Sequence, residues 1–258
     1  MPSSRPSIAE LRRVTQAGIV DRRSAEHWAG RLYMRPLSPY VTRELIRTRV
    51  APNTLTVLMI VVGIAAAVFV AVPNLWSALL AALLIQIYLL LDCVDGEVAR
   101  WTGRTSAVGV YLDRLGHHIV EGAFVVGLGV RAAGGPSTTP SWWYTLGALA
   151  AVLVVIGKLE TDLVVVARAG AGLPTDQETD PVSRIRGIRS ARRLIALVPV
   201  HRLVGAIELS LLLMVAALVD AIRGDLLASQ GLLSLTGFVA VVVVVGHPLT
   251  VVTSGRLR

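Results

Sequence analysis

Six apolar stretches, each close to the length that crosses a bilayer, constrain this 258-residue chain more than any other feature. A transmembrane helix needs roughly 20 consecutive, mostly apolar residues. With 54% hydrophobic and 16% charged residues, the composition excludes a disordered chain and a nucleic-acid-binding domain. The predicted fold class is all-α, a polytopic integral membrane protein. Its six transmembrane helices are predicted at Leu55–Val72, Leu75–Leu91, Val108–Val130, Trp142–Val166, Leu203–Ile222 and Leu226–Val252.

Basic residues concentrate on one side of the predicted membrane. The formal net charge is +8, and 21 of the 25 Lys and Arg residues fall in 1–54, 100–104, 168–202 and the C-terminal end. The opposite side receives only Arg131 and Arg223. Positive residues near the ends of spans favour the cytoplasmic side. We therefore predict an integral protein of the cytoplasmic membrane with both termini in the cytoplasm, as an even number of spans also requires.

The first 52 residues are predicted to form a cytoplasmic or interfacial segment before a six-helix domain at 53–258. This segment lacks the apolar run and cleavage site of a signal peptide. From Trp28 onward, a roughly helical apolar period predicts an amphipathic helix in the membrane interface, with its apolar face at Leu32, Leu37, Val41 and Leu45. Pro36 and Pro39 should break or offset this helix. A solvated basic arm without fixed structure is the alternative.

A cluster of acidic residues lies where the second predicted span ends and the third begins. Asp92 and Asp95 are three residues apart and share one face of their helix. Asp113 and His117, four apart, share a face of the next helix. Carboxylates crowded in a low-dielectric site repel one another unless a cation neutralises them. Oxygen ligands favour Mg²⁺, Mn²⁺ or Ca²⁺, and Mg²⁺ commonly bridges carboxylates and phosphates, so the cluster predicts a metal site for phosphate chemistry on the cytoplasmic side.

Two further residues in this segment suit a phosphate ligand. Gly96 has no side chain and permits close approach of a ligand or a helix. Arg100 offers a planar fork of donors that matches phosphate geometry. The alternative is a purely structural ion-pair network of the aspartates with Arg100 and Arg114.

The segment from Asp92 to His117 resembles the signature of the CDP-alcohol phosphotransferase family, also called CDP-alcohol phosphatidyltransferases. That signature reads Asp, two residues, Asp-Gly, two residues, Ala-Arg, eight residues, Gly, three residues, Asp, three residues, Asp. This chain matches every fixed position except the last, where His117 replaces the aspartate. The start of the first span, from Pro52 and Asn53 to Thr56, is similar to the Pro-Asn-x-x-Thr segment of the same family.

This resemblance implies a membrane enzyme that transfers a substituted phosphoryl group from a CDP-linked donor to an alcohol acceptor and releases CMP. The donor would be CDP-diacylglycerol or a small CDP-alcohol, and family members use a pair of Mg²⁺ or Mn²⁺ ions and form homodimers. The implied metal ligands are Asp92, Asp95, Asp113 and His117. The implied donor-binding residues are Asp92, Gly96, Ala99, Arg100, Gly109, Asn53 and Thr56. The implied catalytic residues are His117 and Asp113.

His117 stands at the position that supplies a metal ligand and a base in the family. Neutral imidazole performs either function. The rival hypotheses are a catalytically inactive lipid-binding homologue and, in another class, a cation-coupled membrane carrier. Glu121, one turn beyond His117, would fix the tautomer of the histidine, replace the absent carboxylate or pair with a neighbouring helix. The basic residues at 184–202 would bind a phosphorylated acceptor or anionic lipid, or merely follow the topology rule.

Overall fold

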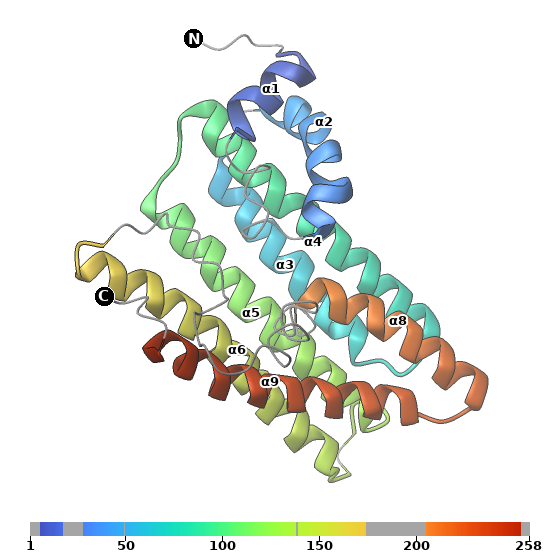
Figure 1. The fold of residues 1–258 in the computed structure, drawn as a ribbon. Coiled ribbons are helices and arrows are strands. Elements are labelled where there is room, and N and C mark those ends of the chain that lie inside the picture. Colours follow the sequence, from blue (N-terminus) through green and yellow to red (C-terminus); the bar gives the residue numbers. More distant parts are fainter. Residues whose placement is uncertain (1–5, 18–27, 49, 138, 174–204, 254–258) are drawn as a thin grey trace. The chain divides into compact units, whose positions relative to one another are not determined.

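The computed structural model describes residues 6–17, 28–48, 50–137, 139–173 and 205–253 of the chain. Every regular element within these ranges is helical, which confirms the all-α fold class for this part of the chain (Figure 1). The elements are α1 (Ile8–Thr15), the π-helical turn η1 (Gly30–Met34), α2 (Arg35–Leu45), α3 (Pro52–Val70), α4 (Leu75–Thr102), α5 (Ala107–Ala132), α6 (Trp142–Gly170), α8 (Ala206–Arg223) and α9 (Leu227–Thr253).

Each predicted span coincides with one helix, although the fifth begins at Leu203, outside the described residues. Among the described helices, α3, α4 and α9 are long and apolar enough to cross a membrane. The count of six spans stays a prediction. Helix α4 continues to Thr102, well beyond the apolar stretch that ends at Leu91, so Asp92 and Asp95 lie on the helix itself.

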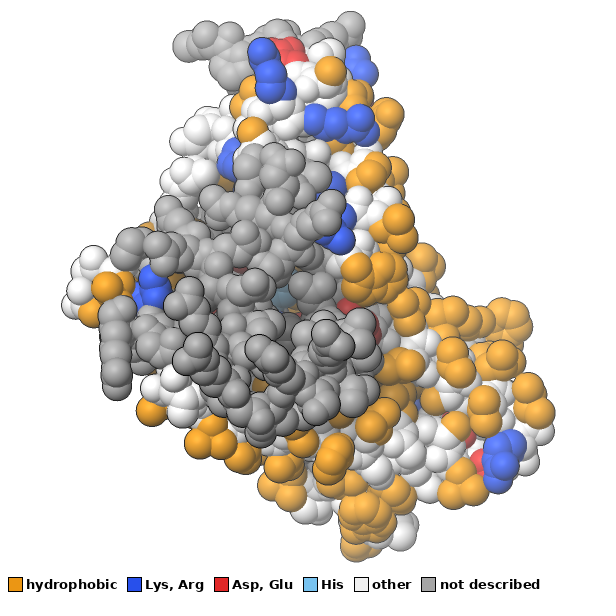
Figure 2. Space-filling view, in the orientation of Figure 1, with side chains coloured by type: hydrophobic (Ala, Val, Ile, Leu, Met, Phe, Trp, Pro, Cys, Tyr) orange, Lys and Arg blue, Asp and Glu red, His pale blue; other side chains and the backbone are white. Residues whose placement is uncertain are grey.

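Large apolar side chains remain exposed along the outer faces of the helices. Val61, Trp76 and Leu163 are examples from three different helices. On the face that Figure 2 shows, many such hydrophobic side chains are visible outside the grey atoms, and several Lys and Arg side chains lie near α1 and α2. Contiguous apolar surface of this extent is rare on a soluble monomer. It suits helices that face lipid.

The structure groups into two compact units. The first comprises Met1–Ala66 with Leu83–Val120, and the second comprises Ala67–Ala82 with Glu121–Arg258. Helices α3, α4 and α5 therefore each contribute one end to the first unit and the other end to the second. The segment that carries the family signature, from Asp92 to His117, belongs to the first unit.

The N-terminal helices show how the chain accommodates two prolines. The π-helical turn η1 runs directly into α2, and Pro36 lies in the first turn of α2, where a missing N–H costs little. Pro39 lies inside α2 and has no N–H to donate to the carbonyl of Arg35, four residues earlier. The side-chain amide of Gln16 donates to that carbonyl instead, at 2.8 Å. The helix therefore continues through both prolines.

The apolar face predicted for the N-terminal segment divides between two environments. The buried core beneath it consists of residues from α3 and α4, namely Leu55, Val94 and Val98. Val41 and Leu45 of α2 pack against this core. Leu32 and Leu37, earlier in the segment, are exposed. Part of the expected membrane-facing stripe therefore packs against protein, and the interfacial position of the segment stays a prediction.

In the second unit, α9 packs along α6 and α8. Helices α5 and α6 approach closely at Gly129 and Gly147, because a Cβ atom on Gly129 would lie only 2.7 Å from the Cα atom of Gly147. A side chain at either position would force the two helices apart.

Arg131 is buried in the second unit, with 1% of its surface exposed. Its Nε donates to the hydroxyl of Ser229 at 2.9 Å, and its Nη1 donates to the carbonyl of Val72 at 2.8 Å. Asp220 accepts hydrogen bonds from the backbone N–H of Ala228 and the hydroxyl of Ser229, which caps the start of α9. The sequence analysis counted Arg131 as a positive charge beside the end of a span. In the structure its guanidinium is buried and forms hydrogen bonds with Ser229 at the start of α9 and with Val72 just after α3.

Candidate active site

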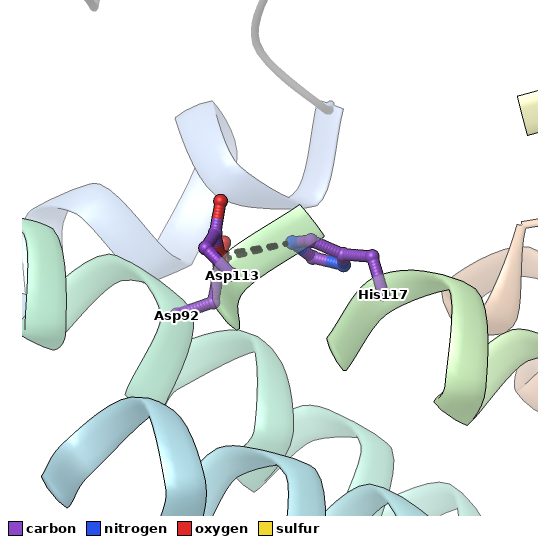
Figure 3. A group of neighbouring side chains, drawn as sticks. All are labelled: Asp92, Asp113 and His117. Atoms are coloured by element: carbon purple, nitrogen blue, oxygen red, sulfur yellow. Dashed lines mark hydrogen bonds and ion pairs between the residues drawn. The ribbon is translucent and has the colours of Figure 1, made fainter. Parts of the chain in front are cut away.

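Two neighbouring helices bring an imidazole and two carboxylates together. Ligand atoms of Asp92 on α4 and of Asp113 and His117 on α5 all lie within 4.8 Å of one another. The Nε2 atom of His117 is 3.1 Å from Oδ1 of Asp92 and 3.5 Å from Oδ1 of Asp113 (Figure 3). The four-residue spacing on α5 places Asp113 and His117 one helical turn apart on the same face. The structure thus brings together three of the four residues that the sequence analysis placed in one cluster, and their roles stay predictions.

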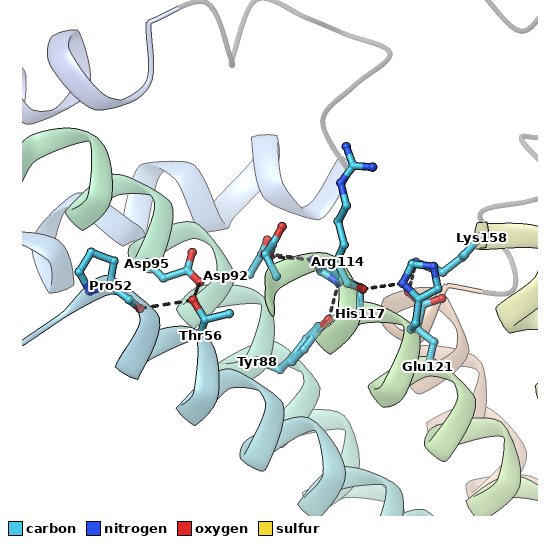
Figure 4. A network of polar contacts seen from close by, with 11 residues as sticks. Pro52, Thr56, Tyr88, Asp92, Asp95, Arg114, His117, Glu121 and Lys158 are labelled. Atoms are coloured by element: carbon cyan, nitrogen blue, oxygen red, sulfur yellow. Dashed lines mark hydrogen bonds and ion pairs between the residues drawn. The ribbon is translucent and has the colours of Figure 1, made fainter. Parts of the chain in front are cut away.

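Asp95 lies beside this group and is held by the start of α3. Its carboxylate is buried and accepts a 2.6 Å hydrogen bond from the hydroxyl of Thr56 (Figure 4). The same hydroxyl contacts the carbonyl of Pro52 at 3.3 Å. The similarity at the start of the first span therefore has a structural reason, because Thr56 orients a carboxylate of the signature.

Asn53, at the start of α3, and Gly109, at the start of α5, also lie close together. A Cβ atom on Gly109 would lie 3.2 Å from Oδ1 of Asn53, so the glycine leaves room for the asparagine side chain. The backbone N–H of Gly109 donates to the hydroxyl of Ser106 at 3.0 Å, in the first turn of α5. Asn53 and Gly109, 56 positions apart in the sequence, thus lie against each other.

Arg100 folds back along α4 over Gly96. A Cβ atom at Gly96 would come within 2.9 Å of Nη1 of Arg100, so a side chain there would displace the guanidinium. The Nε of Arg100 donates to the carbonyl of Thr15 at the end of α1, at 2.6 Å. Ala99, half-buried, precedes Arg100 on the helix. Among the hydrogen bonds that the structure describes, that of Asp92 goes to His117, that of Asp95 goes to Thr56, and that of Arg100 goes to Thr15.

Tyr88 is a site residue that the sequence analysis missed. Its ring is 2% exposed, and its hydroxyl is hydrogen-bonded to Nδ1 of His117 (Figure 4). The two rings meet edge to face, with centroids 5.6 Å apart. Tyr88 precedes Asp92 by one helical turn, so its position on the face of Asp92 was the available sequence signal.

Glu97 is the second residue that sequence reasoning missed. Its carboxylate is fully buried. Oε1 accepts hydrogen bonds from Gln16 at 2.8 Å and from Ser38 at 2.5 Å, and Oε2 accepts one from Thr42 at 2.6 Å. The donors come from the segments around α1 and from α2, so no local pattern near Glu97 indicates them.

Glu121 pairs with a neighbouring helix, which is one of the three roles considered for it in the sequence analysis. Its Oε1 forms an ion pair with Nζ of Lys158 on α6, at 2.6 Å. The ring nitrogen of His117 that Glu121 was expected to orient is bonded to Tyr88 instead. Glu160 and His247 form a second pair at 3.6 Å between α6 and α9. The basic residues at 184–202 lie outside the described part of the chain.

A sequence profile of the CDP-alcohol phosphatidyltransferase family matches residues 49–222. The chain belongs to this family. This member is 34% identical over 119 residues to the bifunctional IPC transferase and DIPP synthase of Thermococcus kodakarensis, covering 46% of this chain and 26% of that protein. It is 33% identical over 111 residues to the phosphatidylinositol phosphate synthase of Streptomyces avermitilis, covering 42% and 43%. Cholinephosphotransferase 1 of Danio rerio is 34% identical over 113 residues, covering 40% and 29%. Each similarity thus spans less than half of the relative's length.

The donor set of this family member fits a divalent cation. Two carboxylates and an imidazole offer three ligand atoms within 4.8 Å, and carboxylate oxygens are the ligands that hard cations prefer. The side chains of Asp92, Asp113 and His117 are 24%, 40% and 29% exposed, so none of the three is fully buried. Asp95, which is buried three residues after Asp92 on α4, adds a third carboxylate.

Proposed function

We propose that this chain is a metal-dependent CDP-alcohol phosphotransferase. It transfers a phosphatidyl or phospho-alcohol group from a CDP-linked donor to an alcohol acceptor and releases CMP, in the synthesis of phospholipids or related polar lipids. The observation that carries the proposal is the convergence of Asp92, Asp113 and His117 in a family member whose other signature positions are intact. The relatives include a phosphatidylinositol phosphate synthase and a cholinephosphotransferase, and these names agree with this reaction class.

In the proposed reaction, the acceptor hydroxyl oxygen attacks the phosphorus that bears the donor's alcohol. A new P–O bond forms, the bridging P–O bond of the diphosphate breaks, and CMP leaves with the bonding electrons. The acceptor proton passes to Nε2 of His117 or to the carboxylate of Asp113, the two groups that we assign as catalytic. When bound, divalent cations, two by family resemblance and either Mg²⁺ or Mn²⁺, neutralise charge on the diphosphate and on the departing CMP.

We assign the metal ligands to Asp92, Asp95, Asp113 and His117. The donor site combines Asp92 with Gly96, Ala99, Arg100, Gly109, Asn53 and Thr56. In this assignment Thr56 acts through its hydrogen bond to Asp95, and Asn53 acts beside Gly109. The Nε atom of Arg100 donates to the carbonyl of Thr15, and the two Nη atoms bind donor phosphate in this proposal.

The proposed setting is the cytoplasmic membrane, with six spans and with both termini and the active site facing the cytoplasm. Residues 1–52 would form the cytoplasmic or interfacial segment, and residues 53–258 the catalytic domain. The apolar helices α3, α4 and α9 and the uneven distribution of basic residues support this arrangement. Family resemblance alone is the basis for proposing a homodimer.

Purified protein, incubated with radiolabelled CDP-diacylglycerol or small CDP-alcohols and a panel of alcohol acceptors, tests the proposal. Metal-dependent release of CMP with a matching labelled product is the expected result. Binding of lipid or CDP-donor without turnover for any pair would favour an inactive homologue. Movement of cations across vesicles without CMP release would favour a carrier.

A further inference from the structure

We propose that Tyr88 is a positioning residue that holds the imidazole of His117 with Nε2 facing the carboxylates of the site. This inference deepens the proposed function and rests on it, because it concerns the group that replaces the family's last aspartate. A carboxylate has two equivalent oxygens and needs no such selection. An imidazole has two distinct nitrogens, so a protein that uses one must determine which nitrogen faces the reaction.

The contacts on the two sides of the ring are of different kinds. Nδ1 of His117 is hydrogen-bonded to the hydroxyl of Tyr88. Nε2 faces Asp92 at 3.1 Å and Asp113 at 3.5 Å. The tyrosine hydroxyl thus occupies the nitrogen that points away from the candidate metal ligands. A half-turn of the ring would place Cδ2 where Nδ1 lies and Cε1 where Nε2 lies, so it would break the contacts with both Tyr88 and Asp92.

Packing holds the tyrosine in place. Its ring is 2% exposed. A Cβ atom on Gly63 of α3 would lie 3.1 Å from Cδ2 of Tyr88, so the absence of a side chain at Gly63 lets the ring pack against α3. A buried aromatic ring that is confined on one face and bonded through its hydroxyl offers a rigid reference for His117.

The hydrogen bond with Tyr88 also suits the proton position that a metal-bound His117 requires. A phenol hydroxyl both donates and accepts, whereas neutral imidazole has one N–H and one lone pair. In the observed contact, Nε2 carries the hydrogen that the carboxylate of Asp92 accepts. To ligate a cation or to accept a proton, Nε2 must expose its lone pair, so Nδ1 then carries the hydrogen and donates it to the oxygen of Tyr88. Histidines that bind metals commonly have such a partner on the second nitrogen. The same tautomer serves His117 in either proposed function.

Nitrogen-15 spectra of the Mg²⁺-loaded protein, labelled on histidine, test this directly. The His117 signal is identified by its loss in His117→Gln. We expect neutral imidazole protonated at Nδ1 in the wild type, and a mixture of tautomers in Tyr88→Phe. Tyr33→Phe is the matched control, because the hydroxyl of Tyr33 donates to Gln86 of α4 at 2.6 Å and does not serve His117. A wild-type ring protonated at Nε2 would overturn the inference.

A double-mutant cycle separates positioning from general stability. Tyr88→Phe should lower kcat by about 10-fold or more, within the range seen for groups that orient metal-bound histidines. In a His117→Asp background, where no imidazole needs orienting, the same change should cost less than about threefold. An equal loss in both backgrounds would mean that Tyr88 only supports the fold. If the wild type shows neither Mn²⁺ binding nor CMP release, the proposed function itself fails, whatever the spectra show.

Discussion

The side-chain amide of Gln16 donates a 2.8 Å hydrogen bond to the carboxylate of Glu97, a residue 81 positions further along the chain. Ser38 and Thr42 donate to the same carboxylate, which is fully buried. Next to it on α4, Arg100 binds the carbonyl of Thr15. One turn of the signature helix therefore holds the N-terminal segment in place beside the candidate active site.

The change Glu97→Gln should loosen the N-terminal helices. An amide has one acceptor oxygen in place of two and no charge, and each hydrogen bond to a charged group contributes ~1.5–3 kcal/mol. We expect hydrogen exchange in α1 and α2 to accelerate about 30-fold, the equivalent of ~2 kcal/mol. Glu44→Gln is the control, because the ion pair that the structure describes for Glu44 is an exposed one with Arg47, at 2.9 Å. Equal exchange in the two variants would contradict the anchoring role.

Turnover should require a divalent cation. The clustered carboxylates and the diphosphate of the donor are all negative, so productive binding needs neutralisation. Chelation should stop CMP release, and Mg²⁺ or Mn²⁺ should restore it. Undiminished release in excess chelator would rule out the metal-dependent mechanism.

Asp92→Asn and Asp95→Asn should each lower kcat more than about 100-fold while the protein stays folded. Each change removes a negatively charged ligand of the metal ions that would neutralise the donor diphosphate. The measurement is CMP release together with thermal unfolding. Asp225→Asn provides a matched control, since Asp225 pairs only with exposed Arg223 among its described ionic partners. Near-normal rates in Asp92→Asn or Asp95→Asn would assign the signature a structural role.

The histidine should separate an active variant from an inactive homologue. His117→Ala should lose about 100-fold or more in kcat, as removal of a general base does. His117→Asp, which restores the family signature, should retain part of the rate. Glu121→Gln should mainly lower thermal stability, because the carboxylate of Glu121 is buried and Lys158 is the ionic partner that the structure describes for it. If His117→Ala matches the wild type while Glu121→Gln is inactive, the base is Glu121.

Cysteine labelling tests the proposed topology. Thr105→Cys, in the exposed link between α4 and α5, should react with an impermeant reagent from the cytoplasmic side. Ser137→Cys, between α5 and α6, should react only from the opposite side. The native Cys93 is buried and serves as an unreactive background. Labelling of both positions from one side would refute the proposed orientation of α5.

Several features of this protein follow from the sequence alone. The apolar stretches predict helices because hydrophobic runs of this length cannot remain in water, and each stretch does carry a helix. The spacing of Asp113 and His117 places them on one face because an α-helix has 3.6 residues per turn. The short link after Arg100 turns α5 back toward α4, so the approach of Asp92 to His117 could also be expected.

Only the tertiary structure decided which partners the polar groups take. Nothing local distinguishes Glu97 from a solvated residue, because its donors lie 55 to 81 positions away. Helical spacing made Glu121 a candidate partner for His117. In the structure the hydroxyl of Tyr88, on the neighbouring helix α4, bonds Nδ1 of His117, and Glu121 pairs with Lys158. Helical periodicity determines the face on which a side chain lies. The group that it meets there depends on how the other helices pack, and that packing is a property of the whole fold.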